Sequence, residues 1–227
     1  MPWAVAIFNL ILSAPYLYDP TIRVGGDYIA YIQQISAVYF GERDYSLLSS
    51  VLGPAYYPAG NFWQYMPIFQ LHMLTDQAEF WSRLCHQGFH TAILFFVIKI
   101  SYLYFYYSPE KAQLIAFILL ANKNDRIFHS EMYNDEVMMM WLVIAIYLVL
   151  QNRPMLASLV FTWALSIKAG VLLLMPAFLG QMQYNFGTVN LIKSIIIILA
   201  VQVIVALPFL LGETSIAIYL EKSKLTG

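Results

Sequence analysis

The sequence predicts an all-α, polytopic membrane protein, because of its composition and the order of its apolar runs. Sixty percent of the 227 residues are apolar and only 11% are charged, whereas soluble domains carry about 25% charged residues. So few charged side chains cannot cover a soluble surface of this size. The net charge of −1 gives no basic field for nucleic acid. The single cysteine, Cys85, excludes a disulfide framework and a thiolate zinc site.

Seven apolar runs predict about seven transmembrane helices within a single transmembrane domain, residues 1–227. The first run lacks a basic leader and a small-residue cleavage site, so we interpret it as a retained anchor. Several runs are short for a span, and they would cross by recruiting flanking polar residues or by facing protein. The runs are Pro2–Tyr18, Phe80–Tyr107, Ala112–Ala121, Val137–Leu150, Met155–Ile167, Val171–Gln181 and Leu191–Leu211.

Residues 19–74 form one loop with interfacial helices on this interpretation. The apolar residues of Asp27–Phe40 recur at helical spacing, which predicts an amphipathic helix at the membrane surface. The stretch Gly53–Gly60 is rich in turn residues and cannot be a regular helix. Asn61–Leu74 is short and polar for a span, so we expect it to be interfacial or re-entrant. If it does cross, residues 19–60 are separated from the other polar segments.

The arrangement in which Asn61–Leu74 does not cross places four polar segments on one side of the membrane. Lysine and arginine are too few on either side to fix the orientation. We prefer this arrangement because it gathers nearly all the chemically capable residues at one face. The four segments are Asp19–Gly60, Lys123–Glu136, the short break at Lys168, and Gly212–Gly227.

Asp27 is the first charged residue that needs an explanation. It follows Gly25-Gly26 and stands at the cap or first turn of the expected helix. A plain helix cap is one interpretation, since Asp is favoured there. The other is a general base, because a helix N-terminus favours the ionised carboxylate.

The second polar cluster is Arg126–Glu136, which lies between two apolar runs. Arg126 and His129 have the chemistry to bind a phosphate, and Asp135 or Glu136 could orient a hydroxyl or hold a metal. A solvated loop with an Asn-Asp cap before the next helix is the alternative.

Lys168 is the third polar feature that needs an explanation, because strong apolar runs lie on both sides of it. It either snorkels to the interface or faces an internal cavity and binds an anionic head group. His72, His86 and His90 lack paired metal-ligand spacing, and we expect them to pack or to form hydrogen bonds.

Five motifs spread over the chain carry a resemblance. They are DYIAYIQ (27–33), GPAYYPAG (53–60), YND (133–135), ALSIKAGVLL (164–173), and VQV (201–203) with LPFLL (207–211). In this order and spacing they resemble motifs of the dolichyl-phosphate-mannose-dependent alpha-1,3-mannosyltransferases of the endoplasmic reticulum. The resemblance implies a GT-C-type helical bundle in a multi-pass membrane protein, with a lumenal active site and residues 19–74 as the first lumenal loop.

The family implied by these motifs transfers mannose from dolichyl-phosphate mannose, with inversion, to the five-mannose dolichyl-diphosphate oligosaccharide. Such lipid donors and acceptors would be its partners, and no metal or other cofactor is expected. Asp27 matches the family's base, and Lys168 would bind the donor phosphate, with Arg126 and His129 as weaker candidates. The acceptor or chamber residues would be Asn134, Asp135, Tyr57 and Tyr28.

The sequence departs from the family pattern at three positions and in its length, and the mildest departure is Tyr28 in place of tryptophan. Glu131 stands where the family has arginine, and Gly170 where asparagine is common. The family's chain continues beyond the LPFLL motif, so we expect an N-terminal fragment of a longer enzyme. Two alternatives stay open: another dolichyl-phosphate-sugar-dependent lumenal transferase, acting on a glycolipid anchor or a later N-glycan, and an inactive or transporter-like membrane paralogue.

Overall fold

The computed structural model describes residues 2–18, 24–75, 77–121 and 131–211, and almost all of its regular structure is helical. Two short strands form a small antiparallel hairpin, β1 (Ser49–Ser50) with β2 (Gly53–Pro54). The α-helices are α1 (Pro2–Tyr18), α2 (Gly26–Tyr39), α3 (Ala59–Leu74), α4 (Ala78–Tyr104), α5 (Pro109–Ala121), α7 (Asn134–Leu150), α8 (Pro154–Ile167) and α9 (Met175–Leu210), and the 3-10 helices are η1 (Tyr45–Leu47) and η2 (Ala169–Leu174).

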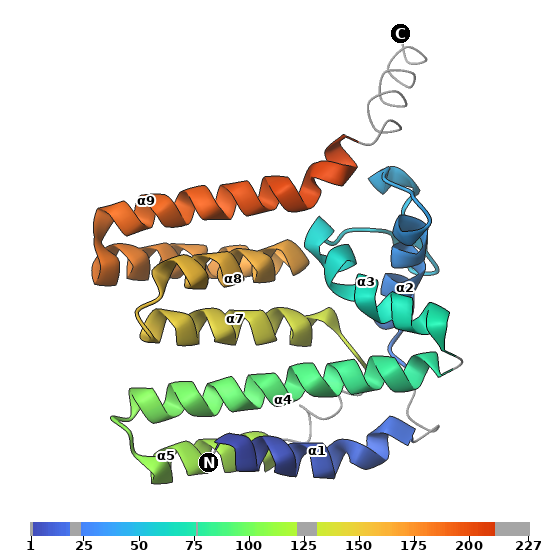
Figure 1. The fold of residues 1–227 in the computed structure, drawn as a ribbon. Helices are drawn as coiled ribbons and strands as arrows, with labels where there is room; N and C mark the ends of the chain where they lie inside the picture. The colour runs from blue at the N-terminus through green and yellow to red at the C-terminus, as the bar shows by residue number, and fades with distance from the viewer. Residues whose placement is uncertain (1, 19–23, 76, 122–130, 212–227) are drawn as a thin grey trace.

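The long helices lie side by side with nearly parallel axes (Figure 1). Neighbouring layers follow the order α1, α4, α7, α8 and α9, and α5 packs on α4 beside α1. Helices α2 and α3 lie together at one end of this bundle and outside its layers (Figure 1). Two helices are thus present in the loop 19–74, and α3 does not run among the long helices.

Helix α9 consists of two antiparallel arms that meet at Gly187. Its φ of 79° is a left-handed conformation that glycine adopts without strain. The chain reverses direction at this residue, so the first arm lies beside α8 and the second returns toward α2 and α3 (Figure 1). Two separate predicted runs, Val171–Gln181 and Leu191–Leu211, therefore correspond to the two arms of a helical hairpin.

Two helical segments of the described chain are long and apolar enough to cross a membrane, Glu79–Tyr104 and Ala169–Leu210. The second includes the reversal at Gly187. Its outer face exposes large apolar side chains, among them Ile196 and Leu199, which suits a lipid environment. The structure is therefore helical and compatible with a polytopic membrane protein, and the count of about seven spans stays a prediction.

A shared apolar cluster joins α2 and α3 to the ends of α7, α8 and α9. Tyr31 of α2, Phe62 of α3 and Ile167 of α8 are each at most 1% exposed within it. Two glycines allow close backbone approach here. A Cβ atom at Gly60 would lie 2.6 Å from the Ser166 carbonyl oxygen, and one at Gly25 would lie 2.6 Å from that of Glu131. These contacts fix α3 against α8, and the start of α2 against the segment before α7.

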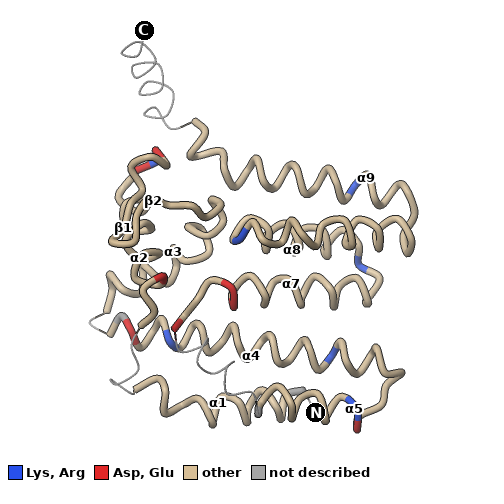
Figure 2. Tube along the Cα trace, turned by 180° about the vertical axis from the view of Figure 1, so that it is seen from behind, with Lys and Arg blue, Asp and Glu red and all other residues tan. Residues whose placement is uncertain are grey.

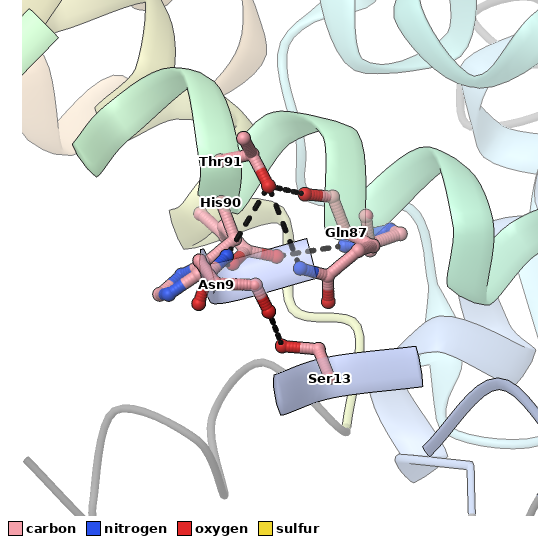
Figure 3. Close-up of polar contacts among 7 residues, drawn as sticks. Asn9, Ser13, Gln87, His90 and Thr91 are labelled. Carbon is pink, nitrogen blue, oxygen red and sulfur yellow. Dashed lines mark hydrogen bonds and ion pairs between the residues drawn. The ribbon is translucent and has the colours of Figure 1, made fainter. Parts of the chain in front are cut away.

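Polar contacts also hold α1 against α4 (Figure 3). Asn9 is 5% exposed and donates from Nδ2 to Thr91 Oγ1 at 3.2 Å, and Thr91 in turn donates to the Gln87 carbonyl at 2.7 Å. These bonds connect two helices of the bundle and involve none of the predicted site residues.

Candidate functional site

Charged residues gather at the end of the bundle that carries α2 and α3 (Figure 2). This end holds the first turn of α2, the first turn of α7 and the last residue before η2. Asp27, Asp135 and Lys168 come from these three elements. The fold thus brings together segments that the preferred sequence arrangement placed on one side.

Lys168 stands where α8 ends. Its backbone is extended (φ −144°, ψ 124°), and the 3-10 helix η2 begins at the next residue. The side chain is 29% exposed, and its Nζ lies 2.6 Å from Asp135 Oδ1. Nζ also donates to Asn134 Oδ1 at 3.4 Å. Lys168 therefore faces the first turn of α7, and its charge is paired with a carboxylate that is itself 56% exposed.

Asn134 is fully buried, and its amide bonds in two directions. Its oxygen faces Lys168, and its Nδ2 donates to Asn61 Oδ1 of α3 at 3.2 Å. The first turns of α3 and α7 and the end of α8 thereby meet through three side chains. Sequence reasoning missed Asn61, because an isolated polar residue in an apolar stretch gives no signal of a partner so far along the chain.

Asp27 lies in the first turn of α2, whose N-cap is Gly25. Its carboxylate is half-buried and stands two residues after the N-cap. No ion pair or hydrogen bond to it occurs within the described ranges. Asp27 is therefore not the N-cap of α2. Its carboxylate lies in the first turn, where the positive end of the helix dipole favours the ionised form.

The charge of Asp27 contributes to the raised pKa values of two tyrosines, Tyr31 and Tyr133. Burial, followed by the adjacent Tyr57, raises the pKa of Tyr31, and the Asp27 charge adds to this. The hydrogen bond with Glu131 raises the pKa of Tyr133 to about 12, with smaller contributions from burial and from the Glu131, Asp27 and Asp135 charges. Tyr133 thus lies among three carboxylates, one of which is Glu131, the residue that stands in place of the family arginine.

Tyr57 connects this site to a cavity of about 520 Å³. The Tyr57 and Tyr31 hydroxyls are 3.2 Å apart. Tyr57 lines the cavity together with Asp44 and Tyr45 from the same loop and Phe209 from the end of α9. The predicted position of Tyr57 beside the chamber is therefore compatible with the structure.

Glu136 has a different environment from Asp135, although the two are consecutive. Its side chain is 10% exposed and lies between two histidines of α4. Glu136 Oε2 is 3.1 Å from His86 Nδ1, and Oε1 is 3.0 Å from His90 Nδ1. His86 Nε2 also lies 3.3 Å from the Tyr65 hydroxyl. The expected hydrogen-bonding role of these histidines holds, whereas nothing in the sequence identified Glu136 as their partner.

Three predicted residues remain: Tyr28 makes buried contacts of its own, and Arg126 and His129 are not described. Tyr28 is 3% exposed and donates to Ser82, with His72 Nε2 at 3.2 Å from its hydroxyl. Because Tyr28 is buried among other side chains, its position does not favour contact with an acceptor sugar. Arg126 and His129 lie outside the described residues.

Comparisons with known proteins agree with the sequence motifs. A family model described as "ALG3 protein" matches residues 24–224. A mouse relative named "Dol-P-Man:Man(5)GlcNAc(2)-PP-Dol alpha-1,3-mannosyltransferase" is 30% identical, over 82% of this chain and 42% of its own length. Relatives with the same name from human (29% identical, 83% and 42%) and Arabidopsis thaliana (27%, 93% and 47%) are similar. The chain spans less than half of their length. No solved structure matches it.

Proposed function

Because the chain belongs to the ALG3 family, we propose that it is part of an enzyme that transfers mannose from dolichyl-phosphate mannose to the five-mannose dolichyl-diphosphate oligosaccharide. The new bond is an alpha-1,3 linkage, and the transfer inverts the anomeric centre. The proposal rests on the family match and on the positions of Asp27, Asp135 and Lys168 at the ends of α2, α7 and α8 that lie at one end of the bundle. The names of the relatives favour this function over another dolichol-dependent transferase or an inactive paralogue.

The reaction is a single displacement in which Asp27 is the base. The acceptor hydroxyl oxygen attacks the anomeric carbon of the donor mannose as its proton passes to the Asp27 carboxylate. The bond from that carbon to the phosphate oxygen breaks, and dolichyl phosphate leaves. The half-buried carboxylate lies in the first turn of α2, where the helix N-terminus favours the ionised form that a base requires.

Lys168 stabilises the leaving phosphate, which carries the charge that develops in the transition state. Its ammonium group is held by Asn134 and Asp135 and remains 29% exposed. A donor phosphate would share this ammonium with Asp135. Arg126 and His129 stay weaker candidates for the same phosphate.

The acceptor side of the site is proposed to include Asp135, Asn134 and Tyr57. Tyr57 links the cavity of about 520 Å³ to Tyr31, which lies beside Asp27. We place the protein in the endoplasmic reticulum membrane as a multi-pass protein, with this end in the lumen. The proposed reaction uses no metal and no other cofactor.

The test is a transfer assay in microsomes from cells that lack their own enzyme of this family and express this chain. We expect dolichyl-phosphate mannose to convert the five-mannose lipid to a six-mannose lipid. Asp27→Asn should lower the transfer rate by about 10²- to 10⁴-fold, the range for loss of a general base. Glu110→Gln, which changes an exposed carboxylate at the start of α5, is the matched control and should leave the rate unchanged. Full activity in Asp27→Asn would overturn the base assignment.

A further inference from the structure

Asn61 occupies a position where an amide is costly for the fold. The residue is 0% exposed, and its Nδ2 group has no hydrogen-bond partner among the described residues. A buried donor without a partner destabilises a protein, because it has lost its hydrogen bonds to water. A pair of apolar side chains at positions 61 and 134 would avoid this loss. The amide of Asn61 therefore calls for an explanation other than stability.

The direction of the hydrogen bonds supplies that explanation. An asparagine amide accepts at its oxygen and donates at its nitrogen, whereas a lysine ammonium group only donates. Lys168 therefore requires Asn134 to present its oxygen, and the Asn134 nitrogen then needs an acceptor on its other side. Asn61 Oδ1 is that acceptor, at 3.2 Å. With its own amide reversed, Asn61 would present a donor to a donor.

We propose that Asn61 is a positioning residue, which holds the Asn134 amide with its oxygen toward Lys168 and thereby fixes the place of the ammonium group. The inference rests on the proposed role of Lys168 in binding the lipid phosphate. A lysine is a point charge on a flexible stem, and Asp135 is too exposed to hold it firmly by itself. The fully buried pair of Asn61 and Asn134 is the rigid part of the network that positions the Lys168 ammonium group.

The test compares two asparagine-to-leucine variants of the purified chain in detergent micelles. The probe is dolichyl phosphate, and each variant is measured for its Kd and its thermal unfolding midpoint. Asn61→Leu should weaken binding about five- to tenfold, as expected for loss of one buried hydrogen bond. Its midpoint should change little, because the variant exchanges one buried donor without a partner, Asn61 Nδ2, for another, Asn134 Nδ2. The matched control is Asn9→Leu, which removes a buried amide between α1 and α4 (Figure 3). It should lower the midpoint and leave the Kd unchanged.

A double variant tests whether Asn61 acts through Asn134. In an Asn134→Leu background the Asn61→Leu change should add no further loss of binding, since its target is already gone. Additive losses would overturn the proposal, as would wild-type affinity in Asn61→Leu. If the wild-type chain binds no dolichyl phosphate, the proposed donor site itself fails and this inference fails with it.

Discussion

Asp135 and Glu136 are consecutive carboxylates in the first turn of α7, and they have opposite environments. Asp135 is 56% exposed and pairs with Lys168, whereas Glu136 is 10% exposed and lies between His86 and His90 of α4. Successive helical residues point about 100° apart, so one carboxylate faces the open end of the bundle and the other faces α4. One short acidic motif therefore provides both a charge near the site and an anchor that sets the rotation of α7.

Replacing Glu136 should produce the largest effect on stability. In Glu136→Leu the two histidine ring groups lose the carboxylate that they share. Each such buried hydrogen bond contributes about 1–3 kcal/mol, so the thermal unfolding midpoint should fall markedly. Glu136→Gln, which keeps one acceptor oxygen, should lie between Leu and wild type. An unchanged midpoint in Glu136→Leu would mean that this carboxylate does not anchor α7.

Replacing Lys168 should affect binding more than stability. We expect Lys168→Met to weaken dolichyl phosphate binding by about tenfold or more, because hydrogen bonds to charged groups are the stronger ones. Its partner Asp135 is exposed, so the carboxylate left behind remains hydrated. Lys193→Met, an exposed lysine on α9, is the control for loss of one positive charge. Equal losses in both variants would show a general charge effect and contradict a specific site.

Replacing Asp135 should produce the smallest effect on stability. Exposed ion pairs contribute about 0–1 kcal/mol, so Asp135→Asn should leave the unfolding midpoint within about 2 °C of wild type. Dolichyl phosphate should bind as tightly or more tightly, because Lys168 loses a competing anion. A drop in affinity as large as in Lys168→Met would show that Asp135 itself contacts the lipid. The measurements are the same two, a Kd and a melting curve.

The helices could be predicted from the sequence because hydropathy is a local property. The amphipathic helix at Asp27–Phe40 is confirmed as α2, and the two runs on either side of Gly187 are confirmed as separate arms. The prediction that Gly53–Gly60 is not helical is only partly confirmed, since its last two residues, Ala59 and Gly60, already belong to α3. Pro58 is the N-cap of this helix, so the turn residues end where α3 begins.

The contacts within the site could not be predicted, because they join residues far apart in the sequence. The chain alone gives no distance between Lys168 and Asp135, or between Asn61 and Asn134. The sequence does not distinguish Glu136 from Asp135, and only the packing of α7 on α4 gives the two carboxylates different environments. The motifs identified Asp27 and Lys168 as candidates, whereas the network that holds Lys168 required the folded chain.

The two close glycine contacts have a consequence for the order in which the protein is assembled during synthesis. Residues 24–75 leave the ribosome well before the Glu131 and Ser166 backbones, against which Gly25 and Gly60 pack. Helices α2 and α3 therefore wait without their final neighbours until α7 and α8 have been made, and the end that holds the candidate site forms late. Since incomplete intermediates expose apolar surface and are prone to misassembly, a substitution at Gly25 or Gly60 should harm the yield of folded protein at this late step.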